Sequence, residues 1–216
     1  MGQGVRLLIF DLDGTLVDSC RDLATAVNLM RRHFELPPLT VEAVTRFVGD
    51  GVRMLVTRAL QGTTVDVDEA MRVQAPLYRD HLLDETVLYP GVEQGLHRLH
   101  ALGYVMAVGT NKPADACERI LEHMKIRGLF ARVMGGGSTP NLKPHPEMLH
   151  AIMKATGIPA AETWMIGDNH TDIESARRAG LRSVFLTYGY GHKGAEHPDH
   201  TVRSFDELLS LLEKRP

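Results

Sequence analysis

Short apolar runs that stop abruptly at polar residues are the feature that most restricts the fold of this chain. Residues 5–10 form the first run, which ends at Asp11. Similar runs follow at residues 104–108, 131–134, 163–166 and 183–186. Continuous apolar runs of this length are typical of strands that are buried on both faces of a parallel sheet. The first run therefore predicts a central strand with an acid at its carboxyl end.

Helical patterns lie between the later runs, with apolar residues three or four positions apart, as at Leu96 and Leu99 or at Ile173 and Ala176. A chain that alternates strands and helices in this way builds βαβ units. We therefore predict an α/β fold with a doubly wound, Rossmann-like parallel sheet at its core.

Residues 17–88 depart from that alternation, because four helical stripes follow one another there without a strand between them. Thr40 can cap the second helix, and Asp68 can start the fourth, in which Pro76 is expected to cause a kink. This pattern predicts a helical cap domain inserted after the first strand. The expected division is residues 1–16 for the first part of the core, 17–88 for the cap and 89–216 for the remainder of the core.

The charge balance excludes two classes of partner. The chain carries 24 Lys and Arg residues against 27 Asp and Glu residues, a formal net charge of −3, so it offers no basic surface for nucleic acid or an anionic membrane. It shows no signal-peptide pattern and no apolar stretch near the ~18 residues that span a bilayer. We expect a cytoplasmic protein whose two cysteines are reduced. Taken alone, the net charge also predicts mild repulsion of phosphate-bearing ligands.

Two acids follow the first apolar run, at Asp11 and Asp13. In a nearly extended chain they point to the same side, while Leu12 between them points into the packing. Gly14 allows a turn with positive φ. Ligands of open parallel sheets bind beyond the carboxyl ends of the strands, where these acids fall. The alternative interpretation is a pair of solvated turn acids.

A second acid pair, Asp168 and Asp172, follows the run at residues 163–166. On its own it could be a helix start that favours acids. Together, however, the two pairs gather at one edge of the sheet, and carboxylates 4 Å apart repel by ~4 kcal/mol at an effective dielectric constant near 20. A cation offsets this cost, and an all-oxygen ligand set on rigid strand ends favours Mg²⁺.

Phosphate-binding candidates lie in two loops. Thr110 and Asn111 follow a core strand and precede a helix, a suitable position for phosphate oxygens. Lys143 lies in a proline-flanked loop and can neutralise both the acids and a phosphate, although a solvated surface lysine is the alternative. The glycine run at residues 135–137 lacks the ending of a P-loop and is interpreted as a flexible turn. None of the histidines forms a zinc-like pattern.

These motifs, in the order Asp-x-Asp-Gly-Thr-Leu, strand-terminal Thr, Lys-Pro and Gly-Asp-x-x-x-Asp, resemble those of the haloacid dehalogenase superfamily. Residues 17–88 resemble the cap of one of its subclasses. The resemblance implies a phosphatase or phosphomutase, because these members keep an acid at the position of Asp13. The segments at residues 48–52, 110–113 and 186–190 further resemble bacterial phosphoglycolate phosphatases. Gly137 and Asn169 depart from their pattern, where Asp and Ser are common.

The resemblance also implies the part that each residue plays. Asp11 is then the nucleophile that forms an aspartyl-phosphate, and Asp13 is the general acid and later the general base. The implied Mg²⁺ ligands are Asp11, the backbone carbonyl of Asp13 and Asp168, while Asp172 contacts the metal through water or supports its ligands. The residues implied around the phosphoryl oxygens are Thr110, Asn111 and Lys143. The residues implied to cover the substrate are Gly49, Asp50, Gly51 and Arg53 or Arg58.

The sequence thus predicts a Mg²⁺-dependent phosphomonoester hydrolase for a small phosphorylated metabolite, with 2-phosphoglycolate as the leading substrate. Three alternatives stay open: a phosphatase for a sugar phosphate or pyrophosphate, a phosphoglucomutase-like phosphoryl transfer, and a receiver-type regulatory domain that is phosphorylated on Asp without turnover.

Overall fold

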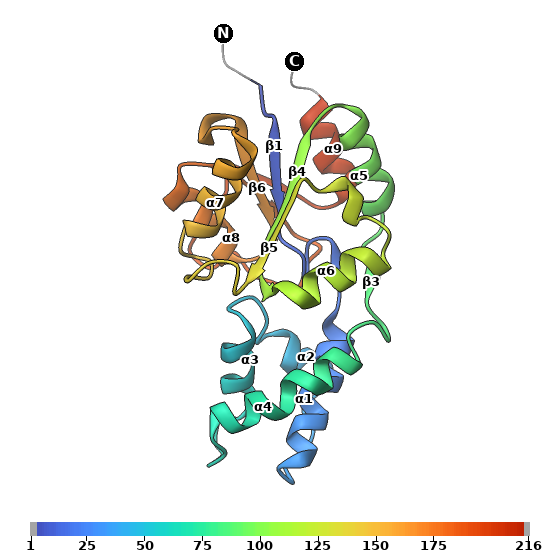
Figure 1. Cartoon of the computed structure of the whole chain (residues 1–216), viewed down its shortest axis with the longest axis vertical. Coiled ribbons are helices and arrows are strands. Elements are labelled where there is room, and N and C mark those ends of the chain that lie inside the picture. Colours follow the sequence, from blue (N-terminus) through green and yellow to red (C-terminus); the bar gives the residue numbers. More distant parts are fainter. Residues whose placement is uncertain (1–3, 214–216) are drawn as a thin grey trace.

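A six-stranded parallel sheet forms the centre of the computed structural model, which describes residues 4–213 (Figure 1). Its strands are β1 (Leu7–Phe10), β4 (Val105–Pro113), β5 (Arg132–Gly136), β6 (Thr163–Gly167), β7 (Arg182–Leu186) and β8 (His200–Val202). Their order across the sheet is β5-β4-β1-β6-β7-β8. The chain therefore runs outward from β1 in one direction, then returns beside β1 and runs outward in the other, which creates a topological switch point between β1 and β6.

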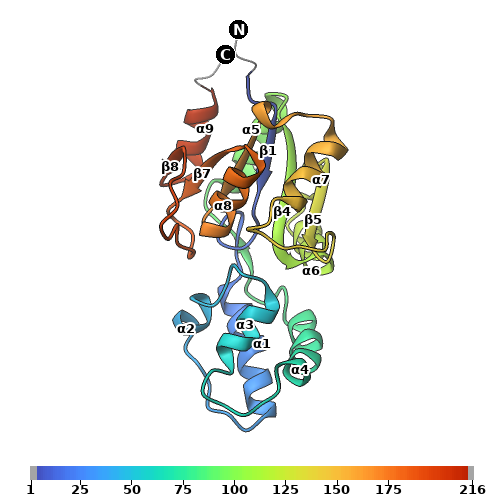
Figure 2. The ribbon, with the colours of Figure 1, turned by 90° about the vertical axis from the view of Figure 1, so that its left-hand side faces the viewer.

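Helices cover both faces of this sheet (Figures 1 and 2). One face carries α5 (Val92–Ala101), α6 (Ala114–His123) and α9 (Phe205–Glu213), and the other carries α7 (Glu147–Thr156) and α8 (His170–Ala179). Two short 3-10 helices, η1 (Arg127–Leu129) and η2 (Ala160–Glu162), complete the connections. The predicted doubly wound α/β fold is confirmed. Within residues 4–213, no helix combines the length and the apolar character that crossing a membrane requires.

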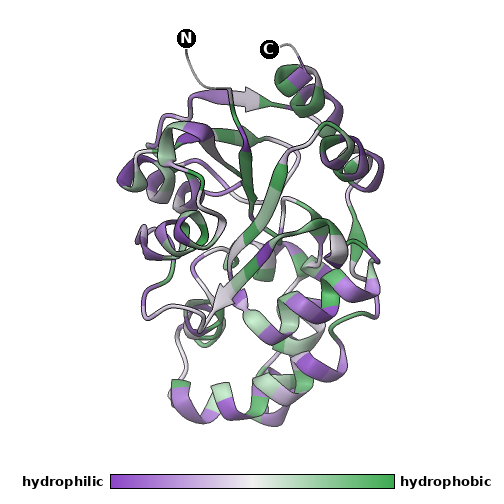
Figure 3. Cartoon of the chain, turned by 45° about the horizontal axis from the view of Figure 1, so that its top comes forward, coloured by the Kyte–Doolittle hydropathy of each residue, from purple (hydrophilic) through white to green (hydrophobic). Residues whose placement is uncertain are grey.

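The central strand β1 explains why the sheet is buried on both sides. Its four side chains have no exposed surface, and they alternate between two apolar clusters. Leu8 and Phe10 pack with α5, α6 and α9, whereas Leu7 and Ile9 pack with α7 and α8. Figure 3 shows the same division, with hydrophobic strands inside and hydrophilic residues on the outer sides of the helices. The continuous apolar run in the sequence follows from this double burial.

The helical segment lies beyond the carboxyl ends of the strands, in the lower half of Figures 1 and 2. It contains α1 (Cys20–His33), α2 (Val41–Thr45), α3 (Val52–Ala59) and α4 (Val67–Asp80). Two short antiparallel strands connect it to the sheet: the chain enters the helical segment through β2 (Val17–Asp18) and leaves it through β3 (Val87–Leu88). The Thr40 side chain accepts a hydrogen bond from the backbone N–H of Ala43 and caps α2, as the sequence predicts.

Three local features differ from the expectations. The fourth helix begins at Val67 and is capped by Asp66, so Asp68 lies inside it. Strand β4 continues to Pro113, through the residues expected to form a turn. The glycine run at residues 135–137 begins inside β5 and is not simply a flexible turn. A Cβ atom at Gly135 would lie 2.6 Å from the Lys112 carbonyl oxygen, so glycine lets β5 approach the end of β4 closely.

A buried carboxylate joins the two ends of the helical segment. Asp22, in the first turn of α1, is 1% exposed. Its oxygens accept hydrogen bonds from the backbone N–H of Glu85 at 2.9 and 3.2 Å and from the backbone N–H and hydroxyl of Thr86 at 2.9 and 2.7 Å. These donors lie just before β3, where the chain leaves the helical segment, whereas Asp22 lies where the chain enters it. The Asp22 side chain therefore joins the two ends of the helical segment.

Replacement of Asp22 by alanine should therefore destabilise the protein. Each buried donor that loses its acceptor costs about 1–3 kcal/mol, and partial access of water should limit the total loss to about 2–4 kcal/mol. Urea denaturation followed by circular dichroism measures the loss. The control is Glu122→Ala on the exposed side of α6, which should change the free energy of unfolding by less than about 0.5 kcal/mol. Equal effects of the two variants would contradict this interpretation of Asp22.

Candidate active site

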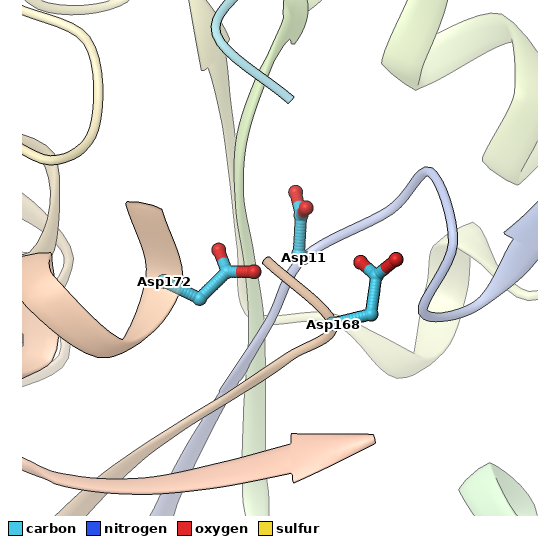
Figure 4. A group of neighbouring side chains, drawn as sticks. All are labelled: Asp11, Asp168 and Asp172. Atoms are coloured by element: carbon cyan, nitrogen blue, oxygen red, sulfur yellow. The ribbon is translucent and has the colours of Figure 1, made fainter. Parts of the chain in front are cut away.

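Three aspartates meet at the switch point between β1 and β6. Asp11 directly follows β1, Asp168 directly follows β6, and Asp172 lies in the first turn of α8 (Figure 4). All three are buried, and one carboxylate oxygen from each lies within 4.8 Å of the others. The two acidic motifs, which are more than 150 positions apart in the sequence, are therefore brought together at one sheet edge.

Lys143 lies behind this cluster. Its ammonium is 2.6 Å from Asp172 Oδ1 and 3.0 Å from Asp11 Oδ1, and its side chain is 1% exposed. Burial favours the neutral form of the lysine, but the two carboxylates outweigh this effect and raise its pKa. The charged lysine thus compensates part of the negative charge, and its loop reaches the site that the sequence assigned to it.

Burial, together with the negative charge that Lys143 leaves uncompensated, raises the pKa values of two of the carboxyl groups. Burial, followed by the charges of Asp11 and Asp172, raises the pKa of Asp168 well above its usual value. Burial also raises the pKa of Asp172 to about 7, where Lys143 opposes the shift and Asp11 adds to it. The cluster is therefore an unfavourable environment for three ionised carboxylates without a further cation.

The residues present fit a divalent cation. Asp11 Oδ1 is buried, and its contact among the described residues is the Lys143 ammonium at 3.0 Å. Asp168 is fixed by a 3.2 Å hydrogen bond from the Thr15 hydroxyl and a 2.7 Å hydrogen bond from the backbone N–H of Gly191. The candidate ligand atoms are all carboxylate oxygens, at the ends of β1 and β6 and in the first turn of α8. This acidic cluster can hold a divalent metal ion.

Close packing explains a glycine beside the cluster. Gly14 has a φ of +79°, and a Cβ atom there would lie 2.1 Å from Asp168 Oδ2. Any larger residue would be strained and would displace the carboxylate. The Gly14 of the first motif therefore permits both the turn after β1 and the close approach of Asp168.

Asp13 points toward a different partner. Its carboxylate accepts hydrogen bonds from Lys112 Nζ at 2.8 and 3.0 Å and from the Ser19 hydroxyl at 2.6 Å. It lines the same cavity as Asp11, whereas Leu12 is fully buried, as the extended geometry predicts. The Asp13 side chain is thus separate from the three clustered carboxylates, and sequence reasoning did not identify Lys112 as its partner.

The second and third motifs meet at Asn111. Its side-chain amide donates to the carbonyl of Lys143 at 2.8 Å and to the carbonyl of Gly49 at 2.9 Å, and its oxygen accepts from the backbone N–H of Lys143 at 2.8 Å. Asn111 therefore holds the lysine loop and the loop of the helical segment against the end of β4. Thr110 is buried beside it, and both residues line the cavity.

The loop at residues 49–51 covers the cavity from the side of the helical segment. Gly49 and Gly51 line it, and a Cβ atom at Gly49 would lie 2.3 Å from Asn169 Nδ2, so Asn169 packs directly against this loop. Asp50 lies 2.5 Å from the Arg58 guanidinium and 3.5 Å from His170 Nε2. The Asp50 carboxylate thus connects the helical segment with the start of α8.

Arg53, a predicted cap position, and Gly137, a departure from the family pattern, are absent from the cavity lining. The Arg53 side chain is 63% exposed and pairs with Asp68 at 2.5 Å. A Cβ atom at Gly137 would meet no atom within 4 Å. The residues that sequence reasoning did not select, but that line the cavity, are Leu23, Val48, Val52, Leu55, Tyr78, Lys112, Pro113 and Tyr190.

Known proteins share these features over most of the chain. Residues 8–186 match the family model of haloacid dehalogenase-like hydrolases. Phosphoglycolate phosphatase from Pseudomonas putida is 41% identical over 96% of this chain and 78% of its own length, and that from Aliivibrio fischeri is 37% identical over 98% of both chains.

The fold is shared as well. The crystal structure of a predicted phosphoglycolate phosphatase from Haemophilus somnus superposes with a TM-score of 0.90 at 32% identity, covering 96% of this chain and 97% of the other. The match of the family model, the identity over nearly the full length and the acidic site at the switch point agree with one another. The chain belongs to the haloacid dehalogenase-like hydrolase family.

Proposed function

We propose that the protein is a Mg²⁺-dependent phosphomonoesterase that hydrolyses a small phosphorylated metabolite, with 2-phosphoglycolate as the leading substrate. The observation that carries the proposal is the buried cluster of Asp11, Asp168 and Asp172, of which Asp11 and Asp168 line a cavity together with Asp13. The likeness to curated phosphoglycolate phosphatases supports the choice of substrate.

In the proposed reaction, a carboxylate oxygen of Asp11 attacks phosphorus while the bond from phosphorus to the ester oxygen breaks. Asp13 gives a proton to that oxygen as the alcohol leaves. Asp13 then accepts a proton from water, whose oxygen attacks the aspartyl-phosphate and releases inorganic phosphate with a free Asp11. The same pair of residues thus serves both halves of the reaction.

Positioning and charge compensation complete the proposal. Lys143 lies against Asp11 and would neutralise phosphoryl oxygens, with Thr110 and the end of β4 beside them. Mg²⁺ would be held by Asp11 and Asp168, with the Asp13 carbonyl as a further ligand and Asp172 close behind. When bound, it would supply positive charge to the phosphoryl oxygens. The loop at residues 49–51 would restrict water around the substrate.

The nucleophile can be tested by Asp11→Asn. This variant should lower phosphate release from 2-phosphoglycolate by at least about 10³-fold, because the amide cannot attack phosphorus effectively. Phosphate release measures the effect, and circular dichroism checks that the fold is intact. Asp115→Asn, on the exposed first turn of α6, is the matched control and should retain activity. Substantial turnover by Asp11→Asn would refute the assignment.

The metal site can be tested by its dependence on pH. In the metal-free folded protein Asp172 holds its proton up to about pH 7, whereas an unfolded chain loses it near about pH 4. The folded state binds more protons between these values, so this group lowers stability as the pH rises through that window. Mg²⁺ binds the ionised form and should offset the loss.

We therefore expect saturating Mg²⁺ to raise the melting temperature by about 5 °C or more at pH 8 and by clearly less at pH 5. Differential scanning fluorimetry of the protein after EDTA treatment and dialysis measures both shifts. Asp168→Asn should abolish most of the response at pH 8. A Mg²⁺ shift that is equal at both pH values, or that survives in this variant, would contradict the proposed ligands.

A substrate panel separates the remaining alternatives. With Mg²⁺, 2-phosphoglycolate should rank among the best substrates in kcat/KM, against sugar phosphates and pyrophosphate, and EDTA should remove the activity. A sugar phosphate or pyrophosphate in first place would replace the substrate. Isomerisation of a sugar phosphate without phosphate release would indicate a mutase. A stable phosphoprotein without turnover would indicate a regulatory domain.

A further inference from the structure

Lys112 and Tyr78 form a polar pair inside the cavity. Lys112 lies near the end of β4 and its side chain is 2% exposed, whereas Tyr78 comes from α4 of the helical segment. The Lys112 ammonium donates to both oxygens of Asp13, at 2.8 and 3.0 Å, and to the Tyr78 hydroxyl. The pair therefore lies next to the proposed general acid, on the side where the alcohol leaves.

The hydrogen-bond directions leave one donor available. An ammonium has only donors, so the Tyr78 oxygen must accept from Lys112. Among residues 4–213, no protein atom accepts the hydrogen of the Tyr78 hydroxyl. Burial raises the pKa of Tyr78 to about 12, an effect that the Lys112 charge opposes, so the hydroxyl keeps its hydrogen at neutral pH. Tyr78 can therefore donate to a ligand in the cavity.

The Lys112 charge strengthens this donor. Among the described residues that line the cavity, Lys112 is the one cation, because Lys143 lies behind Asp11. Burial disfavours the charged form of Lys112, but Asp13 outweighs this effect and its pKa is raised. The three N–H donors of Lys112 are taken by the two Asp13 oxygens and the Tyr78 hydroxyl, so the hydrogen bond to a second negative group on the substrate would come from Tyr78, whose hydroxyl is polarised by the adjacent ammonium.

The part of the cavity wall that the helical segment contributes is mostly apolar. The helical segment contributes four aliphatic side chains to the wall, and Tyr78 is its one polar side chain there. The four are Leu23, Val48, Val52 and Leu55. On this side of the cavity, a polyhydroxylated leaving group would find few hydrogen-bond partners.

We propose that Lys112 and Tyr78 recognise an acidic group on the leaving part of the substrate, so that the site selects small phosphomonoesters with a carboxylate a few bonds from the ester oxygen. The inference rests on the proposed phosphatase function and adds the residues that determine its specificity. The competing interpretation is that Lys112 and Tyr78 only position Asp13 and join the helical segment to the sheet.

Matched substrates separate these interpretations. Ethyl phosphate has the two-carbon chain of 2-phosphoglycolate but a methyl group in place of the carboxylate. The wild-type protein with Mg²⁺ should prefer 2-phosphoglycolate by at least about tenfold in kcat/KM. Tyr78→Phe should lower kcat/KM for 2-phosphoglycolate about tenfold, mainly through KM, while changing that for ethyl phosphate by less than about threefold.

Lys112→Met should reduce both activities, because Asp13 loses a partner, but should reduce that on 2-phosphoglycolate about tenfold further. Tyr190→Phe is the matched control, since Tyr190 lines the same cavity but pairs with Ser19, and it should alter both substrates by the same factor. Circular dichroism verifies the fold of each variant.

The outcomes distinguish the two levels of the proposal. Equal losses on both substrates in Tyr78→Phe and Lys112→Met would overturn acid recognition and leave a positioning pair. A wild-type protein that hydrolyses both esters equally would also overturn it, while the phosphatase function would stand. A wild-type protein that hydrolyses neither ester nor any other member of the substrate panel with Mg²⁺ would remove the phosphatase function and the specificity with it.

Discussion

Electrostatic repulsion at the carboxyl edge of the sheet is the constraint on which the rest of the site depends. Asp11, Asp168 and Asp172 are buried together, and one lysine cannot compensate three carboxylates. Such an arrangement persists only where the surrounding packing fixes it and where a further cation or a proton reduces the charge. The raised pKa values of Asp168 and Asp172 are the direct consequence in the metal-free protein. The stability of the fold and the chemistry of the site are therefore coupled through the same groups.

The packing around this edge meets that requirement with short polar connections between distant segments. Asn111 joins β4, the Lys143 loop and the Gly49 loop, while Asp22 joins the two ends of the helical segment. Asp50 lies between Arg58 and His170 and so connects the helical segment with α8. The Asn111 contacts lie on the wall of the cavity itself. Together, these contacts give the helical segment a defined position over the strand ends, which a ribbon of two residues per strand alone would not provide.

Much of this could be predicted from the sequence, and the exceptions share one cause. The strands, their parallel arrangement and the convergence of Asp11 with Asp168 follow from apolar runs that end at acids, because parallel strands present their carboxyl ends at one edge. The extension of β4 to Pro113 was missed, since a Thr-Asn sequence is equally compatible with a turn. Lys112 and Tyr78 were missed for a related reason. Tyr78 has the spacing of a core residue on α4, and only the docking of α4 onto the strand ends brings it to Lys112.

The net charge of −3 illustrates the same distinction between composition and position. It describes the chain as a whole and would predict weak repulsion of phosphate esters. Around the cavity, however, two buried lysines lie against the acids: Lys112 at Asp13 on the cavity wall, and Lys143 at Asp11 behind that wall. The proposed nucleophile and the proposed general acid thus each have their own cation, one near the phosphoryl group and one near the leaving group. In the proposed reaction, a substrate with two negative groups would bring one charge near each of these lysines, which are already desolvated and held in place.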